Sequence, residues 1–155
     1  MSVAKGDRKE TSDNLETARA FKGLCVYTIQ ICKNEKNFPK RDRWILTQPI
    51  VKCAVKAYAK VTEANAITVI KLEDYMMRRK CQMVARNKLK AMLALVEIAY
   101  DVLSLEESRL EYWTAYIKGC LNLLTRWRSG DRKRYAKQLS GEIAGKTAKK
   151  PGNQL

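Results

Sequence analysis

Apolar residues recur every three or four positions through most of the chain, which is the spacing of one face of an α-helix. Glycine and proline, the residues that most often interrupt helices, are scarce between residues 13 and 128. The pattern predicts four helices joined by short connections. They run over about residues 13–35, 39–67, 72–103 and 104–128.

Each predicted helix carries one apolar stripe that suits burial against the other helices. In chain order the stripes are Ala20, Leu24, Tyr27 and Ile31; Ile45, Ile50, Ala54, Ala57, Tyr58 and Val61; Ala85, Leu89, Met92, Val96, Ala99 and Leu103; and Leu110, Trp113, Ile117, Cys120 or Leu121, Leu124 and Trp127. Four such helices predict an all-α fold, an antiparallel up-down-up-down four-helix bundle. Trp113 and Trp127 are expected in its core or at a subunit interface, rather than stacked on unpaired bases.

The second predicted helix contains two features that affect its course. Pro49 has no amide hydrogen and crowds the carbonyl four residues earlier, so it predicts a kink or a restart capped by Thr47. The stretch "KNFPKRDRW", residues 36–44, leads into this helix. Phe38 and Pro39 suit a helix start, and Trp44 is expected to pack. Further on, "SLEE" at residues 104–107 fits a capping box at the start of the fourth helix.

Composition divides the chain into three parts. Residues 1–12 are expected to form a flexible N-terminus, and residues 13–128 the bundle. Residues 129–155 hold many Lys and Arg and few apolar anchors, which predicts a basic C-terminal tail that is largely disordered when unbound. A short extension of the fourth helix through Tyr135 is the alternative.

The chain is strongly basic. Lys and Arg number 31 against 16 Asp and Glu, and there is no histidine, so the net charge of +15 does not change over the physiological pH range. Such an excess favours an anionic partner: nucleic acid, an acidic protein or an anionic membrane surface. A membrane-surface protein needs an exposed apolar face, and here the apolar stripes are assigned to the bundle, so no membrane partner is expected.

The residue types present argue against an enzyme. Without histidine, the chain lacks the usual general base and the commonest zinc ligand. Glu106, Glu107 and Glu111 lie near a helix start, where acids suit the helix dipole. No nucleophile with a base, phosphate loop or metal cluster is recognisable in the sequence, so we expect no catalytic residue, cofactor or metal.

The five cysteines are well separated and form no C-x-x-C pair. This usage predicts reduced thiols that act as small apolar fillers of a cytosolic core. The first residues lack the apolar stretch of a signal peptide, and no later window is long and apolar enough to span a membrane. A cytoplasmic protein is therefore expected.

The clearest functional signal is the segment "MMRRKCQMVARNKLKAM", residues 76–92, which carries cations and no acid. A solvated helix surface normally mixes signs, because opposite charges four residues apart stabilise a helix and like charges oppose it. The run therefore indicates an external anion; the alternative is a merely soluble helix in a basic protein. At about 100° per residue, Arg79, Arg86 and Lys90 lie near one line, and Arg78 and Lys88 lie elsewhere. The candidate contacts are Arg78, Arg79, Lys80, Arg86, Lys88 and Lys90.

Two further groups of cations are candidate phosphate contacts. Lys40, Arg41 and Arg43 surround the predicted start of the second helix, where free amides and the helix dipole favour an anion. The alternative is a basic helix-starting turn whose charge Asp42 partly offsets. In the predicted tail the candidates are Arg132, Lys133 and Arg134. They suit either contact with nucleic acid or solubility alone.

The order of these segments resembles a known family. A first helix, "NFPKRDR" leading into a second, a third that opens with "YMMRRKCQMVA" and a fourth that ends with "LLTRW" are similar to a small four-helix-bundle family. That family includes the accessory variability determinant proteins of diversity-generating retroelements and the bundle proteins encoded by intervening sequences in bacterial ribosomal RNA genes. The resemblance spans about residues 15–130 and is anchored at Phe38, Pro39 and Lys40, with Arg43 following.

The resemblance implies a homopentameric, barrel-like assembly of bundles with a basic surface. Such an assembly binds a reverse transcriptase and nucleic acid during mutagenic copying of a template RNA. Lys40 and Arg43 are the contact positions that the resemblance carries over. The leading hypothesis is thus a non-enzymatic accessory protein that binds RNA or DNA and partners a reverse transcriptase in mutagenic retrohoming. The alternative is a basic bundle scaffold that binds an acidic protein or ribosomal RNA, unrelated to reverse transcription.

Overall fold

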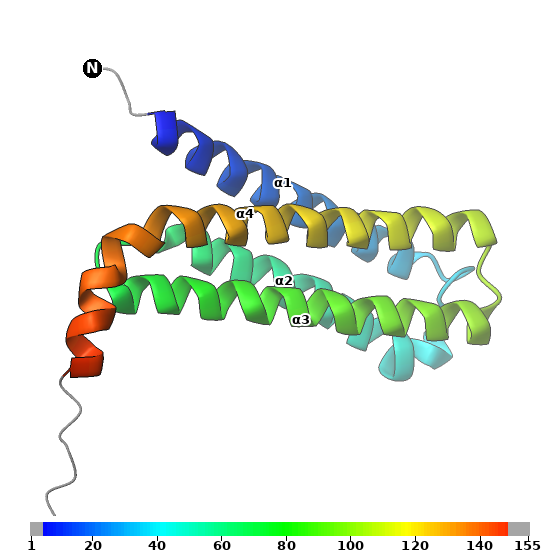
Figure 1. The fold of residues 1–155 in the computed structure, drawn as a ribbon. Helices are drawn as coiled ribbons and strands as arrows, with labels where there is room; N and C mark the ends of the chain where they lie inside the picture. The colour runs from blue at the N-terminus through cyan, green and yellow to red at the C-terminus, as the bar shows by residue number, and fades with distance from the viewer. Residues whose placement is uncertain (1–4, 149–155) are drawn as a thin grey trace, which may run out of the picture.

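The computed structural model describes residues 5–148 and is helical through most of that range, with no strand (Figure 1). The predicted all-α fold is confirmed. In chain order the elements are α1 (Lys5–Lys33), the short 3₁₀ turn η1 (Lys40–Asp42), the π turn η2 (Arg43–Thr47), α2 (Gln48–Ala66), α3 (Leu72–Leu103) and α4 (Glu107–Ala148). No helix among the described residues is both long and apolar enough to cross a membrane.

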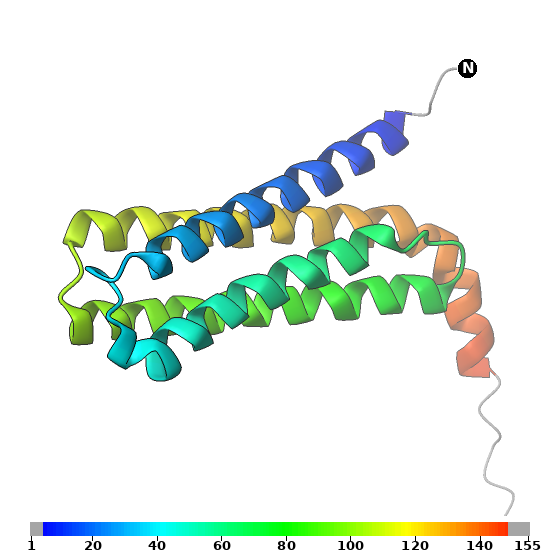
Figure 2. The same ribbon diagram turned by 180° about the vertical axis from the view of Figure 1, so that it is seen from behind.

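The four long helices pack in a closed order. Helix α1 packs against α2 and α4, and α3 packs against the same two helices. Successive helices run in opposite directions, with α3 and α4 towards the viewer in Figure 1 and α1 and α2 towards the viewer in Figure 2. The α1–α2 pair and the α3–α4 pair therefore form opposite faces of the molecule.

The core is built from the predicted stripes around two tryptophans of α4. Trp113 and Trp127 are fully buried, as the sequence predicts. The Trp113 indole nitrogen donates a hydrogen bond to Thr28 Oγ1 at 3.2 Å, and the Phe38 ring meets its edge with a centroid distance of 6.0 Å. Aromatic burial of this size is a large stabilising contribution, and the hydrogen bond satisfies the polar indole N–H.

The start of α2 differs from the prediction of a helix over residues 39–67. Because Pro49 has no amide hydrogen, the carbonyl four residues earlier has no partner in a regular helix. The chain forms the π turn η2 instead, and the Gln48 amide bonds to the Arg43 carbonyl. Helix α2 does begin after Thr47, but the Thr47 side chain makes no capping hydrogen bond, so the prediction that Thr47 caps the restart is wrong.

The π turn also changes which residues face the core. Leu46 is buried together with Ile50, whereas Ile45 is 72% exposed and Trp44 is 74% exposed. The predictions that Ile45 belongs to the stripe and that Trp44 packs are both wrong. A π turn contains one more residue than an α-helical turn, so the buried positions before α2 move by one residue. A prediction based on regular helical spacing therefore places the wrong residues in the core.

The connection between α3 and α4 also differs from the predicted capping box. Ser104 ends α3 in the left-handed conformation, with φ of 54°, rather than starting α4. The first turn of α4 forms around the Glu106 carbonyl, which accepts hydrogen bonds from the amides of Arg109 and Leu110 at 3.0 and 3.1 Å. The predicted span of α3, residues 72–103, is confirmed.

Both ends of the chain are more helical than predicted. Helix α1 begins at Lys5, inside the predicted flexible N-terminus. Helix α4 continues to Ala148, so the prediction of a disordered tail is wrong over residues 129–148; residues 149–155 lie outside the described part. The extension is anchored because Tyr135 and Leu139 of α4 are buried against Leu72 at the start of α3.

A buried polar cluster fastens this extension to α3. Asp131 is fully buried, and one carboxylate oxygen lies 3.3 Å from Nη1 of both Arg78 and Arg134. Gln82 donates a hydrogen bond to the other oxygen at 3.1 Å. Arg78 also donates to the Ile67 carbonyl in the α2–α3 connection. We call Arg78, Gln82, Asp131 and Arg134 the Asp131 cluster.

The Asp131 cluster predicts a large effect of one isosteric substitution. Asp131→Asn removes the charge that balances the buried Arg78, and breaking a buried pair in this way costs about 3–5 kcal/mol of unfolding free energy. Denaturant unfolding followed by circular dichroism measures the loss. Asp101→Asn, at an exposed position of α3, is the matched control and should change stability by less than about 0.5 kcal/mol. Equal effects of the two substitutions would contradict the assignment.

Candidate nucleic-acid interface

Three arginines from two helices meet on the α3–α4 face. Arg79 and Arg86 come from α3 and Arg128 from α4; we call them the α3–α4 arginine cluster. Burial, followed by the positive charges of Arg79 and Arg86, lowers the pKa of the Arg128 guanidinium. Its Nε is buried and has no hydrogen-bond partner. Arg79 and Arg86 are therefore both close enough to Arg128 to repel its charge.

Two members of the cluster, Arg79 and Arg128, border a shallow hollow of about 380 Å³. Its lining residues are Met76, Arg79, Lys80, Met83 and Arg128. Arg79 is held in place by Tyr75: its guanidinium lies 5.8 Å from the ring centroid, and Nη1 donates to the tyrosine hydroxyl at 3.2 Å. Holding a guanidinium in this way leaves its remaining N–H groups oriented for an external acceptor.

The other cations predicted as contacts on α3 are Lys80, Lys88 and Lys90, and their positions agree with the sequence analysis in part. Lys90 is exposed one turn beyond Arg86, and Lys80 is exposed at the hollow. Lys88 points to a different side of α3, where it lines a hollow between α2 and α3 with Lys52 and Lys56. It does not join the arginine cluster.

Arg78 is the clear correction among the predicted contacts. Its side chain is buried, paired with Asp131, and lies 6.0 Å from the Trp127 ring centroid and 5.8 Å from that of Tyr135. A guanidinium that is neutralised and withdrawn from solvent cannot reach a phosphate without unfolding this end of the bundle. The predicted phosphate contact at Arg78 is wrong because its charge is used inside the protein.

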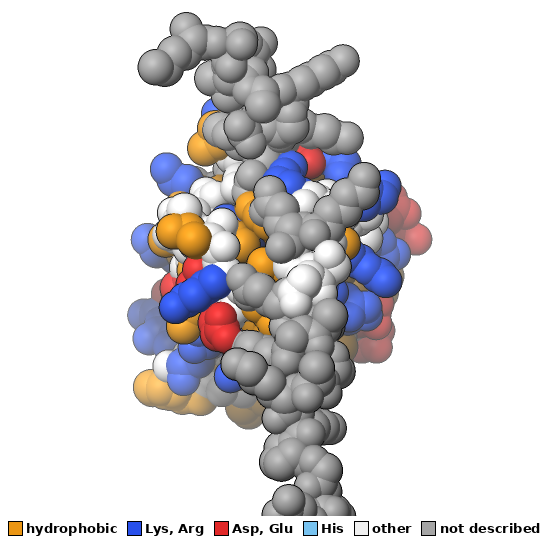
Figure 3. All heavy atoms as spheres, turned by 60° about the vertical axis from the view of Figure 1, so that its left-hand side comes forward, with side chains coloured by type: hydrophobic (Ala, Val, Ile, Leu, Met, Phe, Trp, Pro, Cys, Tyr) orange, Lys and Arg blue, Asp and Glu red, His pale blue; other side chains and the backbone are white. Residues whose placement is uncertain are grey.

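The three cations predicted in the tail also divide into one that is paired inside the protein and two that are exposed. Arg134 bonds to Asp131 and is partly buried, whereas Arg132 and Lys133 are exposed on α4. Lys133 lies on the α1–α4 side, near Asp13 and Arg126. Figure 3 looks towards this end of the molecule and shows Lys and Arg side chains on both flanks, with hydrophobic side chains between them.

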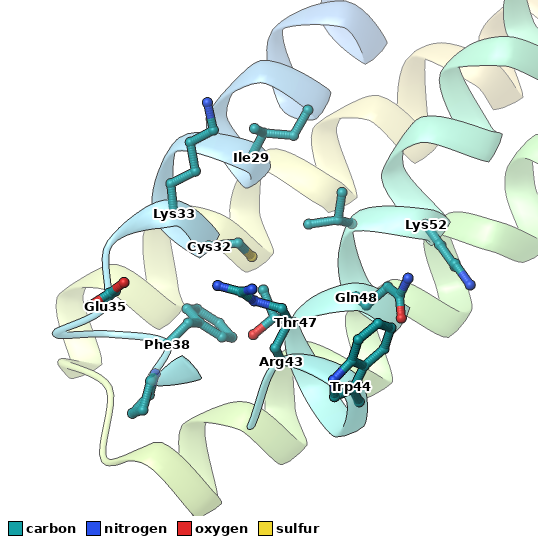
Figure 4. Close-up of a pocket in the computed structure, with 12 residues that line it drawn as sticks. Ile29, Cys32, Lys33, Glu35, Phe38, Arg43, Trp44, Thr47, Gln48 and Lys52 are labelled. Carbon is teal, nitrogen blue, oxygen red and sulfur yellow. The ribbon is translucent and has the colours of Figure 1, made fainter. Parts of the chain in front are cut away.

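The cations of the opening stretch lie far from the arginine cluster. Lys40 pairs with Glu35 at 3.4 Å, and Arg41 lies 3.7 Å from Asp42. Arg43 lines a separate hollow between α1 and α2 (Figure 4). Figures 1 and 2 place this segment beside the end of α3, whereas the arginine cluster lies in its first half, so the two sets occupy opposite ends and opposite faces.

Arg128 is the functional candidate that sequence reasoning missed. It directly follows the buried Trp127 on α4 and lies far along the chain from the basic run of α3. Only the packing of α3 against α4 brings the three arginines together. The available signal is its position: a residue next to an apolar stripe faces the neighbouring helix.

Comparisons with protein families, with curated proteins and with solved structures found no match for this chain. Among the described residues, no group of three or more His, Cys, Asp or Glu side chains is arranged to hold a metal ion. What the structure shows at this site is a grouping of guanidinium and ammonium groups on a helical scaffold.

The buried cysteine thiols are expected to react slowly in the folded protein. Burial raises the pKa of Cys32 and Cys120 to about 12, so at pH 8 about one thiol in ten thousand is ionised. Alkylation with iodoacetamide at pH 8, mapped by mass spectrometry, should therefore label these two more slowly than the partly buried Cys53 and Cys81. All five should react alike in denaturant. Fast labelling of Cys32 or Cys120 in the folded protein would show that the core is open there.

Proposed function

We propose that the protein is a non-enzymatic, nucleic-acid-binding accessory protein built on an antiparallel four-helix bundle. In this proposal the α3–α4 arginine cluster binds backbone phosphates, and Lys80, Lys90 and Arg132 extend the contact. The observation that supports it is that Arg79 and Arg128 line one hollow, with Arg86 close enough to act on the charge of Arg128, and that none of the three has an acidic partner among the described residues.

The energetics of the cluster favour an anionic ligand. Like charges held together in a partly buried setting raise the free energy of the unbound protein, and a phosphate between them relieves that repulsion. Guanidinium groups also match phosphate oxygens in two-pronged geometry. The net charge of +15 favours a polyanion over a single small anion, because long-range attraction and counterion release both increase with ligand charge.

The proposed partner is a reverse transcriptase, on the strength of the sequence resemblance. The resemblance rests on the "NFPK" step between the first two helices and on the basic opening of α3. In this proposal the protein serves a diversity-generating retroelement and acts in the cytoplasm with RNA, DNA or both.

The second candidate is a scaffold for an acidic protein or for ribosomal RNA. Exposed Met76 and Met83 beside the arginines favour it, because flexible apolar side chains suit protein contacts. Charge reversal at Arg79, Arg86 and Lys90 separates the two. Loss of nucleic-acid binding with binding of the partner protein intact supports the leading proposal, and the reverse result supports the scaffold.

We also propose that copies of the chain associate, as the homopentameric assembly implied by the resemblance requires. Ile98 and Val102 are exposed on α3 beside the exposed acids Glu97 and Asp101, a mixed surface that suits a subunit contact. Light scattering at micromolar concentration should therefore give a mass above that of one 17.8 kDa chain. A monomer would contradict the proposed assembly and would leave the proposed role of the arginine cluster unaffected.

Neutralising the arginine cluster should weaken nucleic-acid binding. The variant carries Arg79→Gln, Arg86→Gln and Arg128→Gln, and the matched control carries Arg19→Gln, Lys22→Gln and Lys118→Gln at exposed positions of α1 and α4. Filter binding across a salt series should show lower affinity for the cluster variant, with the slope of log K against log salt reduced by about 2–3.

The control variant should keep most of the wild-type slope, because its cations lie outside the proposed contact. Equal losses in both variants would mean that binding depends on net charge alone, and would contradict the assigned site. Wild-type binding that is weak at low salt, or constant across the salt series, would reject nucleic acid as the ligand.

A further inference from the structure

One tryptophan lies on the surface. Trp44 is 74% exposed and its neighbour Ile45 is 72% exposed, while Trp113 and Trp127 are almost completely buried. The π turn η2 causes this exposure, because its extra residue turns Trp44 away from the core. Turns of this kind are often found at functional sites. An exposed indole is a costly feature in water, which suggests a ligand for its face.

Trp44 borders a hollow of about 510 Å³ between the end of α1 and the start of α2. Its floor is apolar and includes Ile29, Phe38 and Val51. Cations on its rim come from three segments: Lys33, Arg43 and Lys52. In Figure 4 the Arg43 guanidinium points into the hollow, and the Trp44 ring lies beside the Gln48 amide.

The hollow continues along α2. A second hollow of about 630 Å³ shares Val51 and Lys52 with the first and extends to Lys56, with Lys88 contributed by α3. Lys52 and Lys56 are one helical turn apart, about 6 Å along the axis. We call the two hollows together the α2 groove. Among the described residues that line it, Glu35 is the one acid, and it pairs with Lys40.

We infer that the α2 groove binds an unpaired strand of nucleic acid. A base stacks on the Trp44 indole, the Gln48 amide meets a base edge, and Arg43, Lys52 and Lys56 contact successive phosphates. This combination of an aromatic platform and a line of cations is how proteins hold single strands. The inference rests on the proposed function, and adds that the protein distinguishes unpaired strands from duplex.

The preference follows from what Trp44 offers. In a duplex the bases are already stacked on one another, so the indole has no free base face to meet. The arginine cluster on the opposite face contacts phosphates, which both forms of nucleic acid present. Discrimination between the forms therefore comes from the α2 groove.

The test compares two neighbouring exposed positions. Fluorescence anisotropy measures the affinity of labelled twelve-nucleotide oligothymidylate and of a labelled twelve-base-pair duplex for the full-length protein. Trp44→Ala should weaken binding of the single strand by about tenfold or more, through the lost stacking, and leave duplex binding within about twofold. Ile45→Ala, equally exposed but not aromatic, is the matched control and should leave both affinities within about twofold.

Intrinsic fluorescence provides a second readout. Trp44 is the exposed one of three tryptophans, so oligothymidylate should quench the exposed fraction of the emission, and Trp44→Ala should remove that response. Unchanged single-strand affinity in Trp44→Ala, with binding lost in the arginine-cluster variant, would overturn the groove and leave the proposed function standing. No binding of either oligonucleotide by the wild-type protein would overturn both.

Two other occupants would give different results. If Trp44 emission changes with protein concentration in the absence of oligonucleotide, the α2 groove is a contact between copies and the inference is wrong. If poly-glutamate displaces oligothymidylate equally well from the wild type and from Trp44→Ala, charge alone explains the binding. That result would also overturn stacking on Trp44.

Discussion

The burial of one carboxylate determines the arrangement of the end of the molecule where α3 begins. Asp131 is inaccessible to solvent, and an unpaired charge at that depth would cost several kcal/mol. Arg78, Gln82 and Arg134 surround it. For Asp131 to reach them, α4 must continue as a helix past Gly130, and its last part bends across the start of α3 (Figure 1). The same contacts hold the α2–α3 connection through the Ile67 carbonyl.

The Asp131 cluster also positions the proposed phosphate contacts. Adjacent residues on a helix point about 100° apart, so anchoring Arg78 inwards directs Arg79 towards the surface. Arg128 lies one turn before Asp131 on α4, which brings it to the same surface. Two arginines that are neighbours in the sequence thus have opposite roles: Arg78 is neutralised in the interior, and Arg79 keeps a charge that no acid of the described chain balances.

The features that could be predicted from the sequence are those that depend on local spacing. The span of α3 and the burial of Trp113 and Trp127 follow from residues within a few turns of one another. The features that were missed depend on distant partners or on backbone geometry. The burial of Arg78 requires a carboxylate 53 positions away, and the exposed Trp44 lies in a π turn that precedes Pro49. Neither feature can be recognised from the spacing of apolar residues in the sequence.

The two candidate surfaces are structurally independent. The arginine cluster rests on α3 and α4, the first hollow of the α2 groove on α1 and α2, and the buried tryptophans and their neighbours lie between them. Substitutions at sites that share no contacts usually have additive effects. The surfaces also differ in physical character, since grouped guanidinium groups act through charge and are screened by salt, whereas an indole face acts through short-range contact. A ligand that engages both must therefore present phosphates to one face of the bundle and an accessible base to the other.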